Sequence, residues 1–191
     1  GSTYGNGDYI IQTTSNGDND SHNPKNLFDK REDSYYGSYD AFLYNWGASQ
    51  ANAIKYNSDG TPNSSASELV SGVKGEWVSI TLPDNIVLTK YYIKDRVNHN
   101  GSSLSSYIGN ASPLSWKLYG SNDGSSYTEI DSKDDDDTIK NNGAMELNVS
   151  PSAGYNQYVL VITKVNNKTW FGLGEFKLFG VSAPAGEGSS S

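Results

Sequence analysis

Short segments in which apolar and polar residues alternate recur along the chain, and Gly, Asn, Asp and Pro bound them. In the segment 76–82 ("EWVSITL"), Val78, Ile80 and Leu82 fall on one side, and Trp77 falls on the other. A period of two residues is typical of a β-strand. The other candidate strands are 9–14, 87–97, 115–119, 127–131, 145–149, 155–164 and 174–180.

The segment 87–97 ("VLTKYYIKDRV") is a long strand candidate. In it, Tyr91, Ile93 and Asp95 share one face. The tripeptide Pro83-Asp84-Asn85 precedes it and predicts a turn between two separate strands. Helical periodicity is scarce and no strand–helix–strand repeat is visible. The sequence therefore predicts an all-β protein, an antiparallel β-sandwich.

The stretch 113–131 ("PLSWKLYGSNDGSSYTEID") predicts a hairpin. Its turn, Ser121-Asn122-Asp123-Gly124, supplies residues that tolerate a positive φ, so the turn closes at little cost. Trp116 and Leu118 alternate with Lys117 and Tyr119, which places one face in the core. The regularity of this stretch indicates a scaffold element rather than a binding site.

Two long irregular segments interrupt the strands, at about 37–75 and at 98–113. Loops of such length in a compact domain are usually functional or disordered. Residues 48–56 are a candidate for a short helix. We expect one domain over 1–181, with an inserted loop at about 37–75, and a flexible linker or tail over 182–191, as in a module of a larger chain.

Composition narrows the function classes. The chain has 191 residues, a formal net charge of −8 and no Cys. The negative charge disfavours nucleic acid and anionic membranes as partners. With 2 His, no Cys and no nucleophile motif, no catalytic constellation can be named, and we expect no enzymatic activity.

Four blocks of the sequence, in order, resemble the discoidin-like (coagulation factor 5/8 type C) domains, and among them most closely the family 32 carbohydrate-binding modules. The blocks are "NPKNLFDKREDSYYGS", "GEWVSITLP", "PLSWKLYGSNDGSSYTEID" and "GLGEFKLFG". The resemblance implies a galactose-binding-domain-like β-sandwich of jelly-roll type. It also implies that the binding loops gather at one end of the sandwich.

The resemblance further implies a structural Ca²⁺ near the binding loops. The positions that match its ligands are Asp29 and Glu175. Glu32, Ser34 and a carbonyl of Asn26 complete the candidate set, since Ca²⁺ takes oxygen ligands from distant parts of a chain. The family's Gly after the Asp is replaced by Lys30, which disfavours the site. The alternative is that Asp29 and Glu175 pair with Lys30, Arg31 or Lys177 on the surface.

A sugar site is implied in the same way. Arg96 matches an Arg that contacts sugar in galactose-binding members, and Asn98 and Asn100 follow it. Trp170 and Phe171 precede "GLGE", where the family often supplies an aromatic ring that stacks on a sugar. The alternatives are that Arg96 is a structural residue paired with Asp95 or Glu76, and that one of the two aromatic residues belongs to the core.

Galactose specificity is disfavoured, because Gly37 stands where galactose-binding members often have a His. Tyr36 belongs to an aromatic-rich stretch at the start of the insertion. That stretch can serve as a different sugar platform, as a protein-binding surface, or as packing of the loop onto the sandwich. Its aromatic residues are Tyr35, Tyr36, Tyr39, Phe42, Tyr44 and Trp46.

Together these features predict a non-catalytic, lectin-like carbohydrate-binding module with a structural calcium ion. We expect it to attach an extracellular, cell-surface or virion protein to glycans, with galactose-type glycans as one candidate class. The alternative is an adhesion domain that binds protein or peptide through the aromatic-rich stretch.

Overall fold

The computed structural model describes residues 7–14, 24–28, 42–43, 56–95, 112–166 and 172–183. Strand pairing is antiparallel throughout these residues. The strands are β1 (Ile10–Thr13), β2 (Phe42–Leu43), β3 (Glu76–Asp95), β4 (Pro113–Ser121), β5 (Thr128–Lys133), β6 (Ala144–Asn148), β7 (Gly154–Val165) and β8 (Gly172–Ser182). The helices are a 3₁₀ helix, η2 (Pro24–Phe28), and α1 (Thr138–Asn142). The predicted all-β architecture is confirmed.

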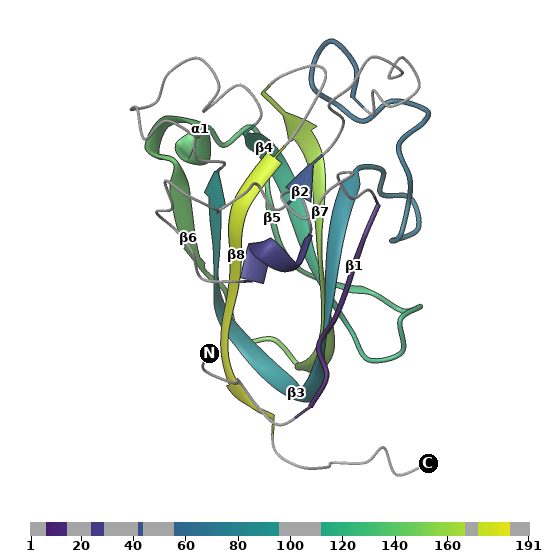
Figure 1. The fold of residues 1–191 in the computed structure, drawn as a ribbon, viewed down its shortest axis with the longest axis vertical. Helices are drawn as coiled ribbons and strands as arrows, with labels where there is room; N and C mark the ends of the chain where they lie inside the picture. Colours follow the sequence, from purple (N-terminus) through teal and green to yellow (C-terminus); the bar gives the residue numbers. More distant parts are fainter. Residues whose placement is uncertain are drawn as a thin grey trace.

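Strand β3 belongs to both layers of the sandwich. Its first part pairs with β1 and β7, and β7 continues through β4 to β5. Its second part pairs with β6 and β8, and β8 pairs with β2. Figure 1 shows β3 passing down one side, bending at the lower end and rising on the other side. The 3₁₀ helix η2, drawn in dark purple, lies between β8 and β1.

The predicted interruption at Pro83-Asp84-Asn85 is wrong. One strand of 20 residues runs from Glu76 to Asp95 and bends there, where its register against β7 shifts between Thr81 and Ile86. Proline lacks the N–H that a regular ladder needs, but a bulge or bend accommodates it. A strand that bends in this way can leave one sheet and enter the other.

The core lies between the two sheets and follows the predicted alternation. Val78 and Ile80 are buried in it, as are Tyr91 and Ile93 from the second part of β3. Trp116 is fully buried on β4, as the hairpin pattern predicted. Its Nε1–H donates a hydrogen bond of 2.9 Å to the Tyr91 hydroxyl, so the two sheets are also joined by a buried polar contact.

A second apolar cluster covers the outer face of the β7–β4 pair. Val70 packs there on Val159, Val161 and Tyr119, and Trp77 contacts the same cluster from β3. Part of the predicted loop at 37–75 is therefore folded against the sheet. Of the candidate helix at 48–56, only Tyr56 lies within the described residues, where it is buried and forms a β-bridge with Pro62.

Helix α1 was not predicted from the sequence. It is a single turn, and it ends at Gly143, whose φ of 79° is a left-handed conformation that favours glycine. The Gly143 N–H donates to the Ile139 carbonyl at 2.7 Å. Ile139 is fully buried, so this one apolar side chain attaches the turn to the core.

Candidate ligand-binding end of the sandwich

Several strands begin or end together at the upper end of the sandwich in Figure 1. Asp95, at the end of β3, is the register partner of Leu173 near the start of β8. Leu173 in turn pairs with Phe42 on β2. On the other sheet, Pro113 at the start of β4 pairs with Val165 at the end of β7. The residues that flank the segments 96–111 and 167–171 therefore meet at one end of the fold.

Buried polar contacts join these strand ends. Asp95 is 2% exposed, and its Oδ2 accepts a hydrogen bond from the hydroxyl of Ser112, which is 0% exposed. The Asp95 N–H donates to the Gly143 carbonyl at 2.7 Å. The Asn166 N–H donates to the Ser112 carbonyl at 3.0 Å. Besides each other, Asp95 and Ser112 thus contact two further parts of the chain, at Gly143 and at Asn166.

A second polar group lies where β3 begins. The Tyr56 hydroxyl donates to the Ile162 carbonyl at 3.1 Å and accepts from the Glu76 N–H at 3.1 Å. The buried carboxylate of Glu76 accepts a hydrogen bond from the Thr14 hydroxyl. Burial, followed by the charge of Glu76, raises the pKa of Tyr56 well above its ordinary value. Tyr56 therefore stays neutral and keeps its hydroxyl proton for the bond.

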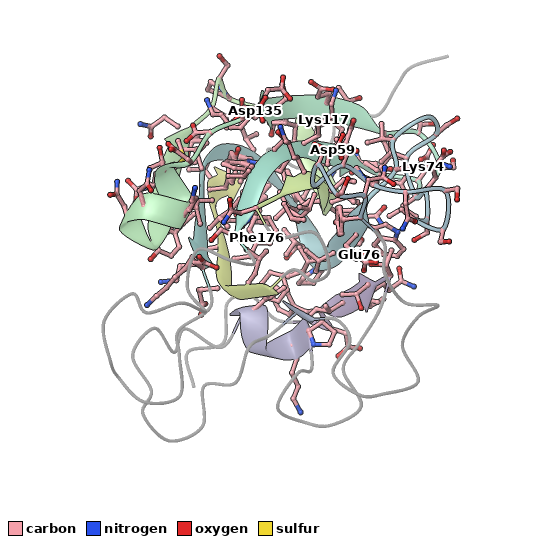
Figure 2. All side chains as sticks on the ribbon, turned by 90° about the horizontal axis from the view of Figure 1, so that it is seen from above. Asp59, Lys74, Glu76, Lys117, Asp135 and Phe176 are labelled. Atoms are coloured by element: carbon pink, nitrogen blue, oxygen red, sulfur yellow. The ribbon has the colours of Figure 1, made fainter. Side chains whose placement is uncertain are left out.

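Figure 2 looks onto this end of the molecule. Phe176 lies inside the sandwich, whereas Asp59, Lys117 and Asp135 lie toward its outer side. Lys164 forms an ion pair with Asp135 there, and this bond raises the pKa of the lysine.

The residues predicted to bind sugar lie outside the described residues. They are Arg96, Asn98, Asn100, Trp170, Phe171 and Tyr36. The structure does describe the residues that directly adjoin two of them in the chain. Arg96 directly follows Asp95, and Phe171 directly precedes Gly172. Because Asp95 pairs with Leu173, the two predicted sugar-binding segments both start from the same pair of strand ends.

Of the predicted calcium ligands, Asp29, Glu32 and Ser34 also lie outside the described residues. Asn26 lies on η2. Glu175 lies on β8 and is 0% exposed. Glu175 therefore does not lie on the surface, and the ion pair that the alternative assigns to it stays a prediction.

The surroundings of Glu175 are partly charged. Lys94 is its register partner on β3. On the same sheet, the Lys177 Nζ lies 5.0 Å from the centre of the Tyr92 ring. Burial raises the pKa of Tyr92, and the negative charges of Glu175 and Glu146 raise it further. A buried carboxylate requires neutralisation by a cation or by hydrogen bonds.

The chain neighbours of two predicted calcium ligands are in contact. Phe28 precedes Asp29, and Phe176 follows Glu175. The rings of Phe28 and Phe176 pack with their centres 5.9 Å apart. Within the residues described, no group of three or more His, Cys, Asp and Glu side chains is arranged to hold a metal ion.

Sequence reasoning missed Ser112 and the role of Asp95. The sequence does contain a pattern that indicates the burial of Asp95. Tyr91, Ile93 and Asp95 are spaced by two residues, so in a strand the carboxylate lies on the same face as the two apolar side chains. Ser112 stands in a stretch rich in Ser, Asn and Gly, and nothing distinguishes it there.

Comparison with known proteins gives a likeness in structure. No family model matches the sequence, and no curated protein matches it. An F5/8 type C domain from Bacteroides fragilis superposes with a TM-score of 0.52 at 9% identity, over 92% of this chain and 93% of that chain. The chain has the discoidin-like fold.

Two carbohydrate-binding modules are similar to it in the same way. Chitosan-binding module 1 from a chitosanase/glucanase of Paenibacillus sp. IK-5 has a TM-score of 0.52 at 12% identity, over 90% of this chain and 94% of that chain. A pectin-binding module has a TM-score of 0.51 at 11% identity, over 91% of each chain. At these identities the likeness establishes the discoidin-like fold alone.

No helix among the described residues of this discoidin-like chain is both long and apolar enough to span a bilayer.

Proposed function

We propose that the chain is a non-catalytic glycan-binding module. The observation that carries the proposal is its discoidin-like fold, which modules described as chitosan-binding and pectin-binding share over 94% and 91% of their own lengths. The sequence adds no catalytic constellation that would indicate an enzyme. We further propose that the module acts outside the cell or on a cell or virion surface.

We place the sugar site at the upper end of the sandwich. Arg96, Asn98 and Asn100 would donate or accept hydrogen bonds to sugar hydroxyls. Trp170 and Phe171 would offer an apolar ring face, and Tyr36 is a further candidate. The register pair of Asp95 and Leu173 supports this grouping, since it joins the strand ends from which both segments start. Galactose is one candidate sugar among others.

A glycan array tests the proposal, with the protein presented multivalently because one shallow site binds weakly. Chitosan oligosaccharide and polygalacturonate serve as soluble probes. The formal net charge of −8 attracts the cationic probe unspecifically, so its binding must persist at high salt. Arg96→Ala should reduce specific binding, and Lys117→Ala, on the outer face of β4, should not.

The array has a second informative outcome. A folded protein that binds no glycan, but binds target cells after deglycosylation, would replace the proposal by the protein-binding alternative.

We also propose that the site includes Ca²⁺, held by Asp29 and Glu175 with oxygens from Asn26, Glu32 and Ser34. Two observations support it: Glu175 is a fully buried carboxylate, and the contact of Phe28 with Phe176 brings the neighbours of Asp29 and Glu175 together. The ion would bind the Glu175 carboxylate and link η2 to β8. The residues thus fit a hard cation with oxygen ligands.

Thermal unfolding with and without Ca²⁺ tests this. At a calcium concentration of about 100 times Kd, binding stabilises a fold by about 2.7 kcal/mol, a rise in Tm of roughly 5–10 °C for a chain of this size. EGTA should reverse the shift. Glu175→Gln should abolish it, whereas Glu146→Gln on the exposed part of β6 should retain it. Equal melting of the metal-free and calcium-loaded protein would exclude the site.

A further inference from the structure

Asp95 and Ser112 lie where the segment 96–111 leaves the sandwich and returns to it. Asp95 is the last residue of β3, and Ser112 directly precedes β4. The Ser112 hydroxyl donates to the Asp95 carboxylate, and both side chains are buried. One hydrogen bond therefore joins the two residues that flank this segment, across the gap between the sheets.

The same two residues also contact both ends of the segment 167–171. The Asn166 N–H donates to the Ser112 carbonyl at 3.0 Å. At the other end of the segment, Leu173 is the register partner of Asp95. The described residues on either side of two separate segments thus contact one pair of residues.

This polar pair is not needed to fill the core. Tyr91 and Ile93 precede Asp95 on the same face of β3, and they fill the core with large side chains. A buried carboxylate is costly, and an apolar residue in its place often stabilises a fold as well or better. What a hydrogen-bonded pair adds is direction, because its donor and acceptor must meet at a fixed distance and angle.

We propose that Asp95 and Ser112 are positioning residues for the ligand-binding end. Their hydrogen bond fixes the separation of the described strand ends that directly precede Arg96 and directly follow Phe171. This inference rests on the proposed glycan-binding function. It goes beyond that function by assigning affinity to residues that do not touch the ligand.

The test uses a matched pair of serine-to-alanine substitutions. Ser112→Ala removes the hydroxyl that donates to the Asp95 carboxylate, so the bond between the two strand ends is lost. Ser79→Ala removes another buried hydroxyl, which is 1% exposed and accepts a hydrogen bond of 2.8 Å from Gln157 Nε2 within the β3–β7 pair. Both changes remove one buried hydrogen bond of a serine, but only the first affects the strand ends at the ligand-binding end.

Hydrogen exchange and glycan affinity are measured on both variants. We expect Ser112→Ala to speed amide exchange in peptides covering 96–111 and 167–171, and Ser79→Ala to leave these peptides unchanged. The Kd for chitosan oligosaccharide or polygalacturonate, whichever the wild type binds, should rise roughly tenfold with Ser112→Ala, since ordering one or two side chains costs about that much. It should not rise with Ser79→Ala.

A conservative variant separates positioning from general stability. Asp95→Asn keeps the volume and an acceptor oxygen but loses the charge, so its exchange rates and Kd should lie between those of the wild type and Ser112→Ala. It also serves as the test if Ser112→Ala does not fold.

Three results would overturn the inference or what it rests on. Equal exchange of these peptides in Ser112→Ala and Ser79→Ala would show that the Asp95–Ser112 hydrogen bond does not hold the two segments. Faster exchange with an unchanged Kd would remove the positioning role. If the wild type binds no glycan, the proposed function fails. Hydrogen exchange alone then still decides whether the Asp95–Ser112 hydrogen bond holds the two segments.

Discussion

The hydroxyl of Tyr91 links the two sheets of the sandwich, and replacing it measures what that link contributes to stability. Tyr91 accepts a hydrogen bond of 2.9 Å from Trp116 Nε1 and donates one of 2.7 Å to Asp131 Oδ2. Tyr91 lies in the part of β3 that pairs with β8, while Trp116 and Asp131 lie on β4 and β5. Burial raises the pKa of Tyr91, so the hydroxyl keeps its proton at neutral pH.

The magnitude follows from the burial of the partners. Tyr91→Phe leaves the N–H of the fully buried Trp116 without its acceptor, which costs about 1–3 kcal/mol. It also removes a hydrogen bond to a charged group, worth about 1.5–3 kcal/mol, at the lower end because the half-buried Asp131 can reach water. The total is about 3 kcal/mol, or a fall in Tm of roughly 6–12 °C.

The assay is reversible unfolding in urea, with Tyr127→Phe as the matched control. The Tyr127 hydroxyl donates to the Gly124 carbonyl at 2.9 Å in an exposed part of the hairpin, so its loss should cost under about 0.5 kcal/mol. Tyr91→Phe combined with Asp131→Asn should be less destabilising than the sum of the two single changes, because both remove the same bond. The reasoning is refuted if Tyr91→Phe and Tyr127→Phe destabilise the fold equally.

The remaining predictions concern a glycine pair and an acid. Gly60 and Gly72 have φ of 85° and 79°, but a Cβ at Gly60 would lie 2.1 Å from the Val165 carbonyl oxygen and one at Gly72 would meet nothing. Gly72→Ala should therefore cost about 1–2 kcal/mol and Gly60→Ala about 1–3 kcal/mol more, and equal midpoints in urea would contradict this. The Asp123 carboxylate accepts backbone N–H bonds, that of Ser126 foremost, which lower its pKa below the ordinary 3.8. The contribution of this carboxylate to stability should be full above pH 3.8 and be lost as the pH falls below it. A pKa of Asp123 at or above 3.8 in an NMR titration would contradict the prediction.

Alternation along the chain predicted the strands well where one face of a strand is uniformly apolar and packs in the core. Val78 and Ile80 face the core and Trp77 the outer cluster, as their spacing required. The hairpin around Asp123 forms where its turn residues predicted it. The bend at Pro83 was not predictable in the same way. A proline signals a break in a ladder, and only the pairing of β3 with strands of both sheets shows that the strand continues through it.

The outer cluster was hidden for a different reason. Val70 stands in a stretch of Ser, Asn and Gly with no periodicity, which predicts a loop. Its burial depends on contact with Val159 and Val161, which lie about ninety positions later in the chain. The residues that alternate with these two valines on β7 face the core instead. Strand β7 is buried on both faces, so its own pattern is a continuous apolar run that does not indicate what covers the outer side.

The upper end of the sandwich shows which residues a single sequence can nominate as functional and which it can place in the fold. Loop residues such as Arg96 and Trp170 were nominated by the family resemblance, and a segment without periodicity gives no position for them. Asp95 is different, because the two-residue period of β3 by itself places its carboxylate on the core face. A charged side chain on the core face of a strand must be matched by a buried partner. Here the partner is Ser112, at the far side of the segment that follows Asp95. The position of Asp95 on the core face therefore explains the buried contact between two strand ends, whereas the roles of the loop residues stay predictions.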